Sequence, residues 1–237
     1  EMKERVSKLI GSQASSIQIS TFHSLGLRLL KENYSKLGYK SNFVILDSDD
    51  TLTVVKKIMK EMNLNPKFYN ARDIRNKISS AKNELMSVSE FAKLEFDQNI
   101  VKVFEKYNKK LVINNSVDFD DLLLLPIKLF KEYPETLKYY QDKYKYVLID
   151  EYQDTNEAQY ILTKLLSAKN RKITCVGDDS QSIYSFRGAN YKNILNFEKD
   201  YKDAKTILLE QNYRSTSNIL DAANQVIKNN KMRKDKN

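Results

Sequence analysis

Residues 146–154 read Tyr-Val-Leu-Ile-Asp-Glu-Tyr-Gln-Asp, a short apolar run that stops at two adjacent carboxylates. Three of the four residues in the run are β-branched or aromatic, which is typical of a buried strand in a parallel sheet. Ligand sites in open α/β sheets lie at the carboxyl ends of such strands. Asp150 could hold Mg²⁺ there, and Glu151 could orient or deprotonate an attacking water. A strand followed by a solvated acidic turn is the alternative.

A second strand is predicted at residues 173–177, and the polar sequence Asp-Asp-Ser-Gln follows it. Between the two strands, residues 156–168 carry apolar side chains at helical spacing, with Thr155 as the expected N-cap. Strand, helix and strand in this order form a βαβ crossover, which brings parallel strands into one sheet. Gln181 would then be placed to contact a terminal phosphate or the attacking water. A turn-exposed amide is the alternative reading of Gln181.

Other elements are expected from local pattern. Strands are expected at 17–20, 43–46 and 206–209, and helices at 25–34, 49–62 with Asp47 as its cap, 118–133 and 217–229. The apolar stripe of the 118–133 helix, which Pro134 ends, consists of Phe119, Leu122, Leu123, Ile127 and Phe130. The segment from about residue 48 to residue 114 reads as lysine-rich helices, broken at Asn65-Pro66 and near Ser87.

Five longer motifs carry a resemblance to a known family. They are Asp150-Glu-Tyr-Gln-Asp-Thr-Asn156, Val176-Gly-Asp-Asp-Ser-Gln-Ser-Ile-Tyr-Ser-Phe-Arg-Gly-Ala189, Leu209-Glu-Gln-Asn-Tyr-Arg-Ser215, Thr21-Phe-His-Ser24 and Asp118-Phe-Asp-Asp-Leu122. The first three resemble motifs II, III and IV of the UvrD/Rep/PcrA-type superfamily 1 DNA helicases. The fourth is similar to their motif Ib, and the fifth resembles a further signature of the family.

The resemblance implies a fold and a domain layout. The fold is a RecA-like P-loop NTPase of the α/β class, with a parallel sheet and an inserted all-helical subdomain. In the family's terms, residues 1–47 and 115–207 would form domain 1A, and residues 48–114 the inserted domain 1B. Residues 208–237 would hold motif IV and the start of domain 2A.

The phosphate-binding loop of such a protein is missing from the sequence. P-loop ATPases need Gly-x-x-x-x-Gly-Lys followed by Ser or Thr, so that backbone amides and the lysine hold the phosphates. None of the five glycines here is followed by lysine. The chain also begins with Glu1 and stops shortly after the motif IV resemblance. We therefore expect a segment of a larger motor that is inactive as an ATPase by itself.

The resemblance also assigns roles to single residues at the nucleotide. Asp150 resembles the family's Mg²⁺ ligand, Glu151 its catalytic base and Gln181 its γ-phosphate sensor, so ATP and Mg²⁺ are the implied cofactors. Tyr213 resembles the aromatic residue that stacks on adenine. Arg214 resembles the cation that meets the γ-phosphate, where a planar guanidinium stabilises developing charge. Ordinary packing is the alternative for Tyr213, and a surface ion pair is the alternative for Arg214.

A second set resembles DNA contacts: Thr21, Phe22, His23, Tyr184, Phe186 and Arg187. Aromatic side chains beside an arginine suit single-stranded DNA, because every base offers a face for stacking that is worth ~1–3 kcal/mol. Phe186 departs from the family, in which Trp is common, so packing is its alternative role. The implied partners are single-stranded DNA and junctions of single- and double-stranded DNA, with repair or replication proteins as further partners.

Charge favours a polyanionic partner. The chain has 40 Lys and Arg against 31 Asp and Glu, a net charge of +9. Residues 56–115 hold thirteen basic and seven acidic residues, residues 228–237 hold five and one, and the remainder sums to −1. Such concentrated positive charge is the usual footprint of nucleic-acid binding. Lysines that only keep helices soluble are the alternative.

Three function classes follow. The first is an ATP-driven translocase that unwinds duplex DNA with 3′ to 5′ polarity, the polarity being implied by the family alone. The second is a nucleic-acid binding module without turnover. The third is a metal-dependent nuclease that would use the carboxylates Asp118, Asp120, Asp121, Asp150, Glu151 and Asp154. The lone Cys175 excludes a disulfide within the chain, and no apolar run approaches the ~18 residues of a membrane span, so a cytoplasmic location is expected.

Overall fold

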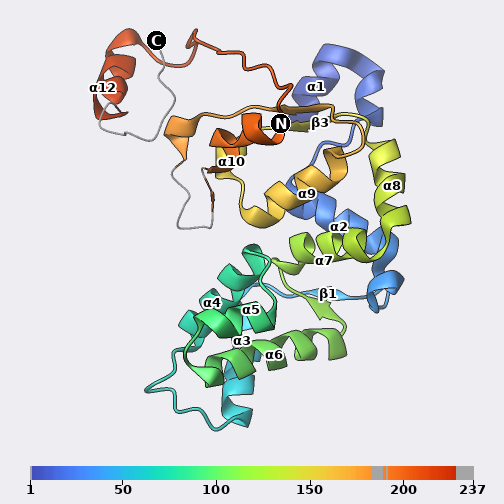
Figure 1. The fold of residues 1–237 in the computed structure, drawn as a ribbon, viewed down its shortest axis with the longest axis vertical. Helices are drawn as coiled ribbons and strands as arrows, with labels where there is room; N and C mark the ends of the chain where they lie inside the picture. Colours follow the sequence, from blue (N-terminus) through green and yellow to red (C-terminus); the bar gives the residue numbers. More distant parts are fainter. Residues whose placement is uncertain (1, 183–188, 191, 228–237) are drawn as a thin grey trace. The chain divides into compact units, whose positions relative to one another are not determined.

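The computed structural model describes residues 2–182, 189–190 and 192–227. It divides into two compact units, residues 1–138 and 139–237 (Figure 1). The elements of the first unit are α1 (Met2–Ile10), the 3-10 helix η1 (Gly11–Ser16), α2 (Phe22–Asn33), η2 (Tyr34–Leu37), β1 (Val44–Ile45), α3 (Ser48–Glu61), α4 (Ala71–Asn83), α5 (Val88–Leu94), α6 (Gln98–Ile113), β2 (Ser116–Val117) and α7 (Asp121–Glu132). Helix α8 (Pro134–Lys143) leads into the second unit, which holds β3 (Val147–Ile149), η3 (Tyr152–Asp154), α9 (Glu157–Ser167), β4 (Ile173–Cys175), η4 (Asp179–Gln181), α10 (Lys192–Leu195), α11 (Phe197–Asp200) and α12 (Ser217–Ile227).

Helices α3, α4 and α5 each begin at a side-chain cap, of which the sequence predicts the first. The Asp47 carboxylate accepts the backbone N–H groups of Asp49 and Asp50, which confirms the predicted start of α3. Asn70 caps α4 and Ser87 caps α5, so the breaks predicted around Pro66 and Ser87 are confirmed. Each cap satisfies N–H groups that the first turn of a helix leaves without partners.

Helices α3 to α6 enclose a hydrophobic core of their own. Its buried members are Val55, Ile58, Met59, Ile74, Ile78, Ala81, Phe91, Ile100, Val101, Val103, Phe104, Tyr107 and Leu111. Strands β1 and β2 lie on either side of the helices in sequence and pair in parallel, Val44 with Ser116 and Ile45 with Val117. The chain therefore leaves β1, forms helices α3 to α6, and returns in β2, the strand that pairs with β1.

Helices α2 and α7 pack at very short range. Gly26 of α2 is buried, and a Cβ at this position would lie 1.7 Å from the carbonyl oxygen of Leu122. Most of the predicted apolar stripe of α7 is buried, but Phe119 is 55% exposed. Phe119 precedes the helix, which starts only at Asp121, so its expected place in the core is wrong. Pro134 opens α8, because the first turn of a helix tolerates the missing N–H of proline.

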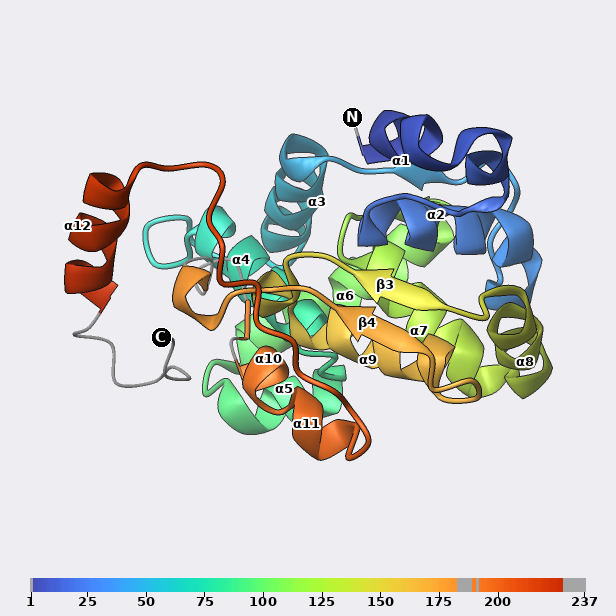
Figure 2. The same ribbon diagram turned by 90° about the horizontal axis from the view of Figure 1, so that it is seen from above.

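The predicted βαβ crossover is confirmed in the second unit. Strands β3 and β4 pair in parallel, with Val147 opposite Ile173 and Ile149 opposite Cys175, and α9 connects them (Figure 2). The predicted cap at Thr155 is wrong by one residue. Asn156 caps α9 through a reciprocal pair of hydrogen bonds with Gln159, while the Thr155 hydroxyl donates to the Tyr152 carbonyl.

Several strand expectations are wrong. Residues 17–20 and 206–209 have no strand partner among the described residues, and a strand needs a neighbour for its backbone hydrogen bonds. The described strands form two separate two-stranded sheets instead of one. The expectation of a buried first strand also fails. Ile149 is buried, but Leu148, on the opposite face of the strand, is 76% exposed. The chain is thus α/β, with short parallel pairs among many helices.

Candidate active site

The two parallel strands of the second unit end at the same edge of their sheet. The ladder continues one step beyond them, because Val176 N–H donates to the Ile149 carbonyl over 2.8 Å and Tyr152 N–H donates to the Val176 carbonyl over 2.9 Å. Asp150 and Glu151 follow β3, and Gly177 and Asp178 follow β4. The sheet edge therefore brings polar groups from two distant stretches of sequence together, as the crossover predicts.

The backbone at Glu151 is in a conformation that side chains rarely adopt. Its φ is +52°, in the left-handed region, which costs a non-glycine residue about 1–3 kcal/mol. Glu151 N–H donates to the Asp150 carboxylate over 3.0 Å, and the side chains of Asp150 and Glu151 are both exposed. This turn presents two neighbouring carboxylates to the solvent at the end of the strand.

Asp154 lies in the same turn. Its Oδ1 is buried and has no hydrogen-bond partner within the described residues. Burial raises the pKa of the Asp154 carboxyl, and the charge of Glu151 raises it further. Asp154 therefore adds a third carboxyl to the turn after β3.

Gln181 reaches this edge from the other strand. It ends η4, and its Nε2 donates to Asp178 Oδ2 over 3.0 Å. Asp178 Oδ1 accepts the N–H of Ser180 over 2.9 Å, which fixes the start of the turn. Gln181 is exposed and thus open to a ligand. The structure brings Asp150, Glu151 and Gln181 into one unit at one sheet edge.

Tyr213 and Arg214 are not joined to that edge in the described structure. Tyr213 is 93% exposed, and the N–H of Arg214 donates to Asn212 Oδ1 in a local turn. No hydrogen bond or ion pair in the described part of the chain connects either side chain to Asp150, Glu151 or Gln181. Their roles at the nucleotide stay predictions.

The first three predicted DNA contacts lie at the start of α2 in the first unit. Thr21 Oγ1 caps this helix by accepting the N–H of Ser24 over 3.2 Å. Phe22 and His23 are half-buried, and the ring centroids of His23 and Phe119 are 6.0 Å apart. Burial lowers the pKa of His23. The negative charge of Asp120 acts in the opposite direction but is the smaller effect. Tyr184, Phe186 and Arg187 lie outside the described residues.

Three of the six carboxylates proposed for a nuclease, Asp118, Asp120 and Asp121, are already bonded to protein groups. Lys82 Nζ, which the sequence does not single out, lies 2.6 Å from Asp118 Oδ2 and 2.7 Å from Asp121 Oδ1. Tyr107 donates to the same Asp118 oxygen over 2.8 Å, and Asn83 donates to Asp120 over 2.8 Å. Within the described residues, no group of three or more His, Cys, Asp or Glu side chains could hold a metal ion. The geometry gives the nuclease alternative no support.

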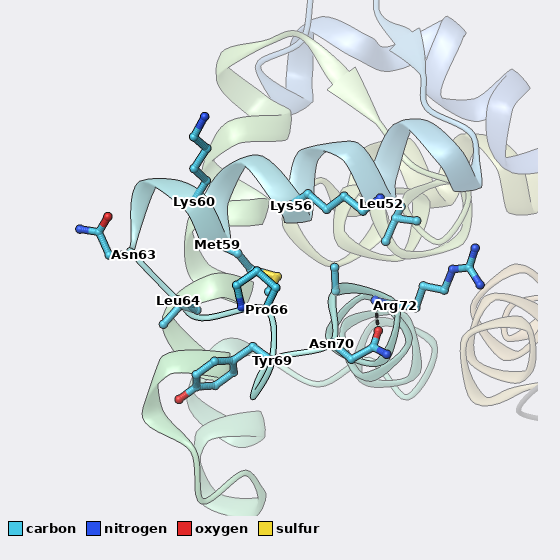
Figure 3. Close-up of a pocket in the computed structure, with 11 residues that line it drawn as sticks. Leu52, Lys56, Met59, Lys60, Asn63, Leu64, Pro66, Tyr69, Asn70 and Arg72 are labelled. Atoms are coloured by element: carbon cyan, nitrogen blue, oxygen red, sulfur yellow. Dashed lines mark hydrogen bonds between the residues drawn. The ribbon is translucent and has the colours of Figure 1, made fainter.

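A groove of about 910 Å³ opens on the helical segment of the first unit. Figure 3 shows that its lining side chains come from α3, from the loop after α3 and from the first turn of α4. Lys56, Lys60 and Arg72 border it, and none of them takes part in an ion pair within the described structure. The groove offers uncompensated positive charge to an anionic partner.

Comparisons with known proteins assign the chain to a family. Residues 1–202 match the UvrD/REP helicase N-terminal domain, and the chain belongs to this family. The family recognised from the five motifs is thereby confirmed. No helix in the described ranges is long and apolar enough to cross a membrane.

The relatives of the chain include proteins named ATP-dependent DNA helicase PcrA. The protein of Bacillus subtilis (strain 168) is 53% identical over 240 residues, which cover 100% of this chain and 32% of the relative. The proteins of Staphylococcus aureus (strain Mu50) and Staphylococcus epidermidis are 49% and 48% identical, each over 100% of this chain and 33% of the relative. The chain spans about a third of the length of the curated relatives it matches.

Proposed function

We propose that this chain is part of an ATP-dependent DNA helicase that couples ATP hydrolysis to 3′ to 5′ movement on single-stranded DNA and unwinds duplexes ahead of it, in repair or replication. One observation supports this most strongly: the β3–α9–β4 unit places Glu151 and Gln181 at one sheet edge. The names of the relatives point the same way. A cytoplasmic location goes with the proposed DNA substrate.

The residues at the edge fit Mg²⁺ and ATP. Asp150 offers hard carboxylate oxygen, of the kind Mg²⁺ prefers, and its exposed side chain is bonded in the described structure only to the N–H of Glu151. When bound, the ion would neutralise charge on the phosphates. Glu151 would orient the attacking water and accept its proton, and Gln181 would contact the γ-phosphate. Tyr213 would stack on adenine and Arg214 would meet the γ-phosphate.

The proposed domain layout follows the family. Residues 1–47 and 115–207 would build a RecA-like P-loop domain 1A, and residues 208–237 would begin domain 2A. Residues 48–114 would form the all-helical insertion 1B, an assignment supported by the separate core of α3–α6 and by the parallel strands on either side of them. The Gly-Lys-Thr loop that holds phosphates is not in this sequence, so the chain by itself is proposed to be inactive as an ATPase.

DNA would contact both units. Thr21, Phe22 and His23 are proposed strand contacts in the first unit, and Tyr184, Phe186 and Arg187 are proposed contacts in the second. The cations around the groove, Lys56, Lys60 and Arg72, would attract phosphates at single- and double-strand junctions. Such contacts add affinity without reading sequence.

The test uses the full-length protein. DNA-stimulated ATP hydrolysis, and strand displacement from a duplex with a 3′ single-stranded tail but not from one with a 5′ tail, are the expected results. Displacement from the 5′-tailed duplex alone would contradict the polarity. Absence of DNA-stimulated hydrolysis would contradict the helicase, and metal-dependent DNA cleavage without ATP would favour a nuclease.

A further inference from the structure

A buried glutamine beside the proposed catalytic base has a defined orientation. Gln153 is 1% exposed, and its Oε1 accepts the backbone N–H of Asp178 over 3.0 Å. A backbone N–H can only donate, so the oxygen of the amide must face it. The Nε2 group is thereby turned toward Glu151, where it donates to Oε2 over 2.7 Å.

The same glutamine joins the two strand ends. Its backbone carbonyl oxygen accepts a hydrogen bond from the hydroxyl of Ser182 over 3.3 Å, which adds a contact to the turn after β4. Asp178 in turn accepts Nε2 of Gln181 over 3.0 Å. A continuous series of contacts thus runs from Glu151 through Gln153 and Asp178 to Gln181. Both ends of this series are residues proposed to act on the γ-phosphate.

Gly177 makes room for this arrangement. A Cβ at Gly177 would lie 2.5 Å from Gln153 Oε1 and 3.2 Å from the backbone nitrogen of Tyr152. Any side chain at Gly177 would therefore displace the amide of Gln153 or the turn that carries it. A glycine at this position leaves the space that the buried amide of Gln153 occupies.

We propose that Gln153 is a positioning residue: it holds the carboxylate of Glu151 and fixes it to the turn that carries Gln181. This inference rests on the proposed ATP hydrolysis, because it assigns Gln153 a role through Glu151. Gln153 is 1% exposed and both ends of its amide are bonded to protein, so it is not placed to contact substrate directly. Gln153 acts on the orientation of the base and leaves nucleotide binding to the exposed residues.

The test is a double-mutant cycle in the full-length protein. Gln153→Met keeps the length and the apolar stem of the side chain and removes both hydrogen bonds. A misplacement of about 1 Å at a catalytic group costs about 10²-fold in rate, so kcat should fall by about 10–100-fold. The KM for ATP should stay within about threefold. In the Glu151→Gln background, the same change at Gln153 should lower kcat no further.

Two further variants separate positioning from general damage. Gln141→Met is the matched control, because it also removes an Nε2 donor in the same unit, to the Leu165 carbonyl at 2.7 Å, and it should leave kcat within twofold. The exchange variant Glu151→Gln/Gln153→Glu reverses donor and acceptor at the contact. It should recover the melting temperature that Gln153→Glu alone loses to repulsion between two carboxylates.

The outcomes are distinct. An equal fall of kcat from Gln153→Met in both backgrounds would show that Gln153 acts independently of Glu151 and would overturn the inference. So would a kcat within twofold of the parent, or no recovery of melting temperature in the exchange variant. A parent protein without ATP hydrolysis would instead overturn the proposed function, and the inference with it.

Discussion

Replacing Lys82 with methionine should strongly destabilise the chain, because Lys82 is the buried cation of the first unit's ionic cluster. Its side chain is 3% exposed, and those of its partners Asp118 and Asp121 are 6% and 8% exposed. Removing one partner of a buried ion pair costs ~3–5 kcal/mol, since the remaining charge is left without compensation. One kcal/mol moves the melting temperature of a chain of this size by about 2–4 °C. The melting temperature should therefore fall by about 6–20 °C.

The loss should also depend on pH. Burial raises the pKa of Asp121 to about 6. Burial acts on Asp118 in the same direction, but the charge and hydrogen bond of Lys82 outweigh it and lower the pKa of Asp118. Removing Lys82 removes the charge and the hydrogen bonds that oppose burial most strongly, so the folded-state pKa values of both carboxyls should rise. Stability from such groups is present at low pH and is lost as the pH rises through the folded pKa.

The assay is thermal unfolding of the purified chain by circular dichroism at pH 5 and pH 8. The deficit of Lys82→Met relative to the parent should be smaller at pH 5, where the buried carboxyls take up protons. Lys77→Met is the matched control on the same helix. Lys77 pairs with Glu95 at the surface, with 47% of its side chain exposed, so its loss should cost about 1 kcal/mol or less. A fall below about 2 °C for Lys82→Met, or equal deficits at the two pH values, would refute the reasoning.

Two further predictions concern packing and charge. Gly26→Ala should lower the free energy of unfolding, measured by chemical denaturation, by about 1–3 kcal/mol. Alanine favours helix more than glycine does, but its Cβ would lie 1.7 Å from the Leu122 carbonyl oxygen. Unchanged or higher stability would show that α2 and α7 are further apart. Binding of this chain to a labelled single-stranded oligonucleotide can be measured by fluorescence anisotropy, and the logarithm of the affinity should fall with the logarithm of the salt concentration at a slope of about −0.7 per phosphate neutralised. The triple variant Lys56→Ala/Lys60→Ala/Arg72→Ala should reduce the magnitude of that slope by about 2. Salt-independent binding would show that the charge distribution is misleading.

Local signals were sufficient for much of the fold. The cap at Asp47 could be predicted because it depends on groups two and three residues away. The crossover from β3 to β4 could be predicted because two apolar runs, and between them a segment with apolar residues at helical spacing, follow one another directly in the sequence. The cap of α9 shows the limit of such signals. Thr155 and Asn156 are both good capping residues, and the reciprocal bond with Gln159 decides for Asn156.

Contacts across long stretches of sequence were not predictable. Lys82 is one of thirteen basic residues in its segment, and its partner Asp118 lies 36 positions away. Gln153 bonds to Asp178, 25 positions away, so the spacing within its own motif does not reveal its role. The apolar residues at 206–209 match a strand in composition, but sequence alone does not show whether a neighbouring strand is available.

The most direct test of the account is Glu151→Gln in the full-length protein. Glutamine keeps the shape of the side chain and removes the carboxylate that would accept a proton from water. A catalytic base of this kind contributes about 10²–10⁴ in rate. Binding of magnesium and a fluorescent ATP analogue should therefore stay within a few-fold of the parent, while the rate of DNA-stimulated ATP hydrolysis falls by at least about 100-fold. Hydrolysis within threefold of the parent would show that Glu151 is not the base and that the sheet edge is not the catalytic centre.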